Sequence, residues 1–113
     1  MTIDELLAGS RTAAAEHGRA TREGNARKAN KAYRKLNRFA TQLKKRGADA
    51  HAGWLALLDE KDDAVRVWAA SHALEFAPEQ AVRTLRSVAS GRPGPDRLDA
   101  EMTLREWEAG RLP

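Results

Sequence analysis

The chain has 113 residues, no cysteine and a charged fraction of 32%. A chain of this length builds one domain with a modest core, and without cysteine it has no disulfide, thiolate metal site or cysteine nucleophile. Its N-terminus carries acids where a signal peptide would be basic, and no stretch holds the ~18 consecutive apolar residues of a membrane-spanning helix. We therefore expect a single cytoplasmic domain over residues 1–113, with no part in a membrane.

Charge is distributed unevenly along the chain. Residues 1–57 hold 12 basic and 5 acidic side chains, a net charge of +7, whereas residues 58–113 hold 8 basic and 11 acidic side chains, a net charge of −3. The most unbalanced window runs from Arg19 to Arg46 and contains eleven Lys or Arg and the single acid Glu23. Because an uncompensated group of cations attracts acidic partners, this window is the first candidate for a binding surface.

Ala and Leu dominate the apolar residues, a composition that favours helices over strands. The first expected helix runs from Thr2 to about Gly18, with Thr2 or Asp4 as its N-cap and Gly18 as its stop. This helix is poor in large apolar residues. The pattern therefore leaves open whether residues 1–24 pack on the rest of the domain or form a mobile N-terminal helix.

A second, more strongly amphipathic helix is expected from about Ala26 to Arg46, closed by Gly47. At 100° per residue its apolar side chains share one side: Ala29, Ala32, Tyr33, Leu36, Phe39, Ala40 and Leu43. The opposite side carries four cations, Arg27, Lys31, Arg34 and Arg38, and Lys28 and Lys35 flank them. We predict that they form a partner-binding surface, because no acid between Asn25 and Ala48 relieves their repulsion.

Two helices are expected after Gly47, and each carries a tryptophan. Asp49 can cap the first, which contains Trp54, and Asp62 or Asp63 can cap the next, which contains Trp68. The favoured interpretation of these indoles, and of Trp107 further on, is that they anchor the core; the alternative is an aromatic binding patch.

Two more helices follow these. Pro78 suits the first turn of a fifth helix, and the segment GRPGPD at residues 91–96 is expected to be a loop. The last helix, from about Asp96 to Ala109, presents the apolar side chains Leu98, Met102, Leu104 and Trp107, and we expect the nearby chain end to leave Trp107 partly exposed. Short capped helices joined by tight turns predict an all-α fold, a short stack of antiparallel helical hairpins of the HEAT/armadillo-like repeat type.

Two stretches carry a family resemblance. The segment DDAVRVWAASHALEF, at residues 62–76, resembles the second helix of a HEAT repeat, which implies that Arg66 pairs with acids at the turns. From about Asn25 to Leu112, with VRVWAA and LREWEAG in order at compatible separation, the chain resembles a prokaryotic HEAT-like family catalogued only as a domain of unknown function, DUF2019. This resemblance implies a HEAT-like core over residues 25–112, leaves residues 1–24 outside it, and carries no reaction. Some members resemble immunity proteins of bacterial toxin systems.

No pattern of catalytic or metal-binding residues stands out. No two of His17, His51 and His72 have the i, i+4 spacing with a neighbouring acid that places two metal ligands on one helical face. The acids at residues 59–63 crowd a turn, where solvent keeps their ionisation ordinary, and no glycine-rich phosphate-binding loop occurs. We expect neither enzymatic activity, nor a metal or cofactor, nor a small-molecule substrate.

Two functions remain to be compared. The first is a non-enzymatic protein-interaction module with an acidic protein partner, in its most specific form an immunity-type protein that neutralises a bacterial toxin. The alternative is nucleic-acid binding through the basic helix at residues 26–46. Few aromatic residues, an acidic second half and no helix-turn-helix spacing count against the alternative. The sequence fixes neither the partner nor the oligomeric state, and a permanent place in a larger complex is a third interpretation.

Overall fold

The computed structural model describes residues 1–112, and over this range it is all-helical, which confirms the predicted all-α class. Its elements in chain order are α1 (Ile3–Arg22), α2 (Ala26–Lys45), the short 3-10 turn η1 (Gly47–Ala50), α3 (His51–Leu57), α4 (Asp63–Ala73), α5 (Pro78–Ala89) and α6 (Pro95–Glu108). No helix within residues 1–112 is both long and apolar enough to cross a membrane.

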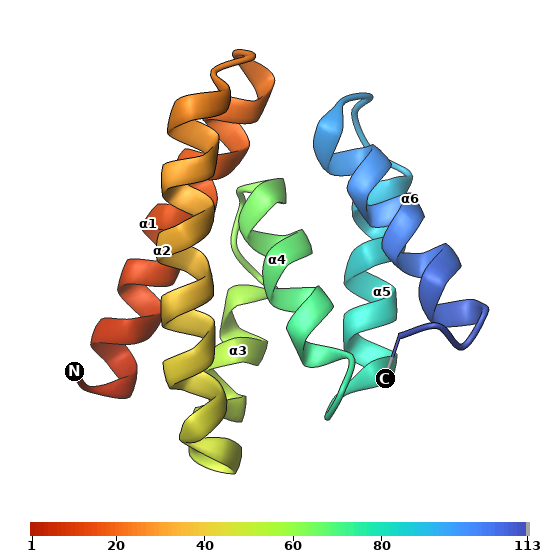
Figure 1. Cartoon of the computed structure of the whole chain (residues 1–113). Helices are drawn as coiled ribbons and strands as arrows, with labels where there is room; N and C mark the ends of the chain where they lie inside the picture. The colour runs from red at the N-terminus through yellow and green to blue at the C-terminus, as the bar shows by residue number, and fades with distance from the viewer. Residues whose placement is uncertain (113) are drawn as a thin grey trace.

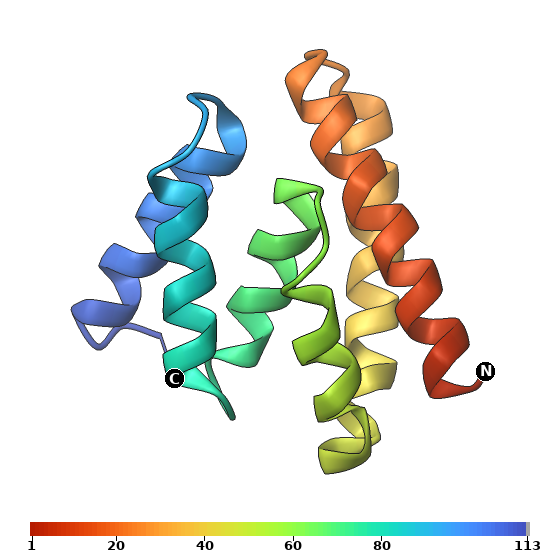
Figure 2. The same ribbon diagram turned by 180° about the vertical axis from the view of Figure 1, so that it is seen from behind.

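The helices follow one another in pairs across the molecule. In Figure 1, α1 rises from the N-terminus and α2 returns beside it, α4 occupies the middle, and α5 and α6 lie on the far side. The reverse view in Figure 2 brings α1, α3 and α5 to the front. The helices α2, α4 and α6 therefore share one side of the molecule, and α1, α3 and α5 share the other.

The centre of the core is α4, which packs against α1, α3, α5 and α6. Its residues Val65, Val67, Ala69, Ala70 and Ala73 are all buried. Small side chains on this helix let four neighbours approach closely, and larger residues of those neighbours, among them Leu6, Trp54 and Leu85, fill the space around it. Both expected core tryptophans meet here, since the Trp54 and Trp68 ring centroids are 4.9 Å apart.

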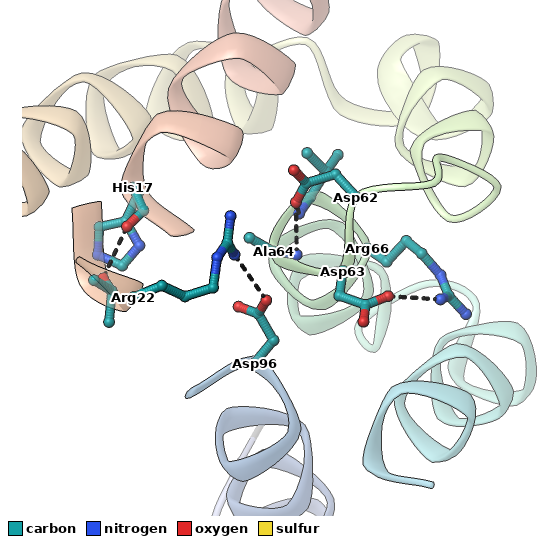
Figure 3. Close-up of polar contacts among 9 residues, drawn as sticks. His17, Arg22, Asp62, Asp63, Ala64, Arg66 and Asp96 are labelled. Atoms are coloured by element: carbon teal, nitrogen blue, oxygen red, sulfur yellow. Dashed lines mark hydrogen bonds and ion pairs between the residues drawn. The ribbon is translucent and has the colours of Figure 1, made fainter. Parts of the chain in front are cut away.

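The start of α4 is capped by one of the two aspartates that the sequence predicted for this role. Asp62 is its N-cap, and its Oδ1 accepts hydrogen bonds from the backbone N–H groups of Ala64 and Val65 at 2.9 and 3.3 Å. Asp63 instead pairs with Arg66, Oδ1 to Nη1 at 2.9 Å, as the HEAT resemblance implied (Figure 3). The second Arg66 nitrogen donates to the Ser87 hydroxyl and so ties α4 to α5.

The start of the chain is packed on the core. Thr2 is the N-cap of α1, and its hydroxyl and the Glu5 carboxylate complete a capping box. The expected stop at Gly18 is wrong, because α1 continues to Arg22 and Gly18 is buried against Ala64 of α4. The positive φ of +72° that ends the helix belongs to Gly24.

Other expectations about local structure also fail. Asp49 caps no helix: it lies inside η1, and neither η1 nor α3 has a side-chain cap. Tyr33, Leu98 and Met102, expected on apolar helix sides, are 54%, 56% and 52% exposed. Trp107 is half-buried on the core, between the two interpretations considered for it.

Candidate functional site

The six predicted binding cations all lie on α2 and reach solvent. Arg27, Lys28, Lys31, Arg34 and Arg38 are exposed, and Lys35 is half-buried. Within residues 1–112 none of the six forms an ion pair, whereas six ion pairs join other arginines to acids, and every one of those acids lies in residues 58–113. Six of the eleven acids in residues 58–113 are thus paired with arginines of this chain, whereas the six α2 cations have no ion pair in the described part of it.

The six cations divide into two rows. Lys28, Lys31 and Lys35 line a shallow groove of about 400 Å³ between α2 and α1, together with Glu16, Arg19 and Glu23 of α1. At 100° per residue, Arg27, Arg34 and Arg38 point directly away from the buried residue Leu36, toward solvent. The single face predicted from the sequence is therefore a lysine groove beside an arginine ridge. We call the six residues together the α2 cationic surface.

The electrostatics of α2 are unfavourable to the helix itself. Arg27 and Lys28 lie in its first turn, at the positive end of the helix dipole, and no acid accompanies them there. Lys31 has like-charged neighbours at i−4, i−3, i+3 and i+4. Only Lys44 and Lys45, in the last turn, suit the dipole. The charge pattern therefore weakens α2 rather than stabilising it.

A second candidate site was not predicted from the sequence. A cleft of about 280 Å³ lies where α1, α2, α4 and the start of α6 meet. Its lining includes His17, Tyr33, Trp68, Ser71, Asp96 and Asp99. Tyr33, which the sequence placed on the apolar side of α2, lies here with its ring centroid 5.8 Å from that of His17. We call this site the central cleft.

The two carboxylates of the central cleft have different surroundings. The Asp96 Oδ2 lies 3.3 Å from Arg22 Nη1, in a contact that joins the ends of α1 and α6 (Figure 3). Burial raises the pKa of Asp96, and Arg22 opposes the rise. Asp99 has no ion pair within the described residues; burial raises the pKa of its carboxyl too, and His17 opposes that rise.

The other two histidines, His51 and His72, each pack against aromatic rings. His51 begins α3, where its ring stacks on Phe76 with centroids 3.7 Å apart. His72 lies between Trp54 and Trp68, at 4.8 and 5.1 Å, and burial, with a smaller contribution from Lys44, lowers its pKa to about 4. No group of three His, Asp or Glu side chains among residues 1–112 is arranged to hold a metal ion.

The family match and the similar crystal structure both cover nearly the whole chain. The family described as Domain of unknown function (DUF2019) matches residues 4–108, so the match takes in α1, which the sequence resemblance left out by starting at Asn25. The crystal structure of the protein RPA1889 from Rhodopseudomonas palustris CGA009 is similar at a TM-score of 0.90 and 27% identity, over 97% of this chain and 91% of that one. Among curated proteins, none matches the chain.

Proposed function

This chain belongs to the DUF2019 family, whose description assigns no activity, and we propose from its surface that it is a non-enzymatic module that binds an acidic protein partner through the α2 cationic surface. Its cytoplasmic location and its narrower role as an immunity-type protein that neutralises a bacterial toxin stay predictions from the sequence. The HEAT-like interpretation, three helix pairs α1/α2, α3/α4 and α5/α6 stacked side by side, belongs to the same proposal.

The observation that supports the proposal is that the cations of α2 have no acidic side chain within residues 1–112 paired with them. Every ion pair among the described residues uses a cation outside α2, and every acid in those pairs lies beyond residue 57. An ordinary solvated face mixes both signs, because like charges three or four residues apart destabilise a helix. A partner that supplies acids would relieve this repulsion and would also be steered toward the surface during encounter.

The shape of the surface favours an acidic protein over nucleic acid. Glu16 and Glu23 line the lysine groove, where they would repel a phosphate backbone. Single-stranded nucleic acid is usually held by exposed aromatic rings on which bases stack, and among the described residues Tyr33 is the one aromatic side chain that is more than half exposed. A protein partner can instead place single carboxylates against Lys28, Lys31 or Lys35 and away from the two glutamates.

A pull-down from nuclease-treated extract of the native cell tests this proposal. The baits are the wild type, a variant with Arg34→Glu and Arg38→Glu, and a matched control with Arg83→Glu and Arg105→Glu. All four arginines are exposed and unpaired among the described residues, so both variants change net charge equally. The α2 changes also reduce like-charge repulsion with Lys31 and Lys35, so the helix should remain folded.

We expect an acidic protein that the wild type and the control capture and the α2 variant loses. Equal capture by all three baits, or equal loss in both variants, would contradict a role for this surface. Material that disappears on nuclease treatment would make nucleic acid the partner instead. For the immunity-type role, the captured protein must be a toxin whose effect on cells the wild type suppresses and the α2 variant does not.

A further inference from the structure

The central cleft is separate from the α2 cationic surface and has a different chemistry. It receives one aromatic side chain from α2, Tyr33, and another from α4, Trp68, while α6 supplies the carboxylate of Asp99. Its volume of about 280 Å³ lies just below the usual lower limit of ~300 Å³ for ligand pockets, so its occupant must be small.

The aromatic side chains of the cleft are held in different ways. Trp68 is fixed from behind by Trp54, with centroids 4.9 Å apart, and by an edge contact with His72 at 5.1 Å. Tyr33 is 54% exposed and has ring contact with His17 alone among the aromatic side chains of residues 1–112. The cleft thus has one rigid aromatic wall and one that can adjust. The faces of such rings attract cations within ~6 Å of the ring centre.

The charge of the cleft, like its aromatic side chains, favours a cationic ligand. Asp96 is already paired with Arg22, but no cation lies within ion-pair distance of Asp99 in the described part of the chain. Asp99 is exposed in the cleft; packing removes part of the solvation of its carboxylate, and His17 offsets that loss only in part. An anionic ligand would be repelled by both carboxylates, and an apolar one would desolvate Asp99 further without compensation.

We propose that the central cleft binds one organic cation, a guanidinium or ammonium group, with Asp99 as its counter-ion and with Tyr33 and Trp68 as aromatic walls. The occupant is either a single basic side chain presented by a polypeptide or a small free amine, and the two share the same head group. Asp96 also lines the cleft, and its ion pair with Arg22 keeps this second carboxylate from competing for the ligand. The proposal does not depend on what binds α2.

Titration of the full chain followed by NMR chemical shifts tests the proposal with defined probes. N-acetyl-arginine amide and butylguanidine carry the guanidinium with and without a peptide backbone, and N-acetyl-citrulline amide is the uncharged isostere. We expect both cationic probes to shift the indole N–H of Trp68 and the amides around Tyr33 and Asp99, and the citrulline probe to leave them unchanged. Tighter binding of the arginine probe than of butylguanidine would identify a polypeptide source, and equal binding a small free cation.

Variants separate this site from general electrostatic attraction. Asp99→Asn should weaken the cationic probes at least about tenfold, because a charge-assisted contact is lost. Asp59→Asn removes an exposed acid with no ion pair among the described residues and should leave binding unchanged. Tyr33→Ala should weaken binding several-fold, and thermal unfolding checks that each variant is folded. Equal shifts with citrulline, or full affinity in folded Asp99→Asn, would overturn the proposal.

Discussion

Gly18 of α1 lies against Ala64 of α4, so closely that a Cβ atom at Gly18 would stand 2.4 Å from the Cβ of Ala64. Both residues also line the central cleft. This contact places α1 directly on the central helix, and it accounts for a glycine in the interior of a 20-residue helix, where alanine would be the better helix former.

Gly18→Ala should therefore destabilise the protein. Overpacking at a tight contact costs ~1–3 kcal/mol, which exceeds the ~1 kcal/mol that alanine adds through helix propensity. Urea unfolding followed by circular dichroism measures the difference. Adding Ala64→Gly to the same chain should recover part of the loss, because the opposing Cβ is removed. Unchanged or increased stability in the single variant would show that the helices can separate here without penalty.

Two aspartates that look alike in sequence should respond differently to removal. Asp62 accepts two backbone hydrogen bonds at the start of α4, so Asp62→Ala should lower the free energy of unfolding by ~0.5–2 kcal/mol, and Asp62→Ser should retain most of it. Asp49 makes no cap in η1 or α3, so Asp49→Ala should change stability little. A larger loss at Asp49 than at Asp62 in the same unfolding assay would contradict the assigned caps.

The contrast between these aspartates shows how far local sequence reasoning reaches. Asp62 caps a helix whose first residues repeat the helical apolar pattern, so neighbouring residues suffice to predict its role. Gly18 differs, because a glycine near an expected helix end reads as a stop, and only the distant Ala64 shows that it is a close contact. Periodicity likewise placed Tyr33 on the apolar side of α2. It could not predict how much of that side a neighbouring helix would cover.

The two candidate sites also differ in how far local sequence reasoning could predict them. The six cations of α2 were predicted from the sequence, because their charge and their 100° spacing are local properties. Their division into a lysine groove and an arginine ridge depends on where α1 packs. The central cleft draws residues from four helices, and its carboxylate Asp99 and its aromatic Tyr33 are far apart in the chain. Residue spacing within one helix could not have predicted that Asp99 and Tyr33 line the same cleft.

The pH dependence of stability should report on His72. Burial lowers the pKa of its imidazole to about 4, against ~6.5 in an unfolded chain. As the pH falls below ~6.5, the unfolded chain therefore binds a proton that the folded chain does not, and stability falls until the pH reaches the folded pKa. Between about pH 7.5 and pH 5.5, where this effect begins, the free energy of unfolding should drop by about 1 kcal/mol.

A histidine variant identifies the source of this drop. His72→Phe keeps an aromatic ring between Trp54 and Trp68 and should flatten the pH profile. Asp96 and Asp99, whose pKa values are raised, act in the opposite direction at lower pH, because the folded chain then takes up protons first and is stabilised. A slope that survives in His72→Phe would assign the titration to another group.

Neutralising a cation should have opposite effects on α2 and α6. Lys31 has four like-charged neighbours, Arg27, Lys28, Arg34 and Lys35, at helical contact spacing. Lys31→Gln should therefore raise the free energy of unfolding at low salt by about 0.5 kcal/mol or more. Arg105 has Glu101 and Glu108 at the equivalent spacings, so Arg105→Gln should lower it by a few tenths of a kcal/mol, ~0.3.

Salt is the control that separates this effect from packing, because screening should shrink both differences as ionic strength rises toward about 1 M. If Lys31→Gln is instead neutral or destabilising at low salt, Glu16 and Glu23 in the neighbouring groove already compensate the charge. The α2 cationic surface would then need no partner to relieve it. A stabilising change that also weakens partner capture would show that the chain keeps these cations at the expense of its own stability, as is common for residues that serve binding.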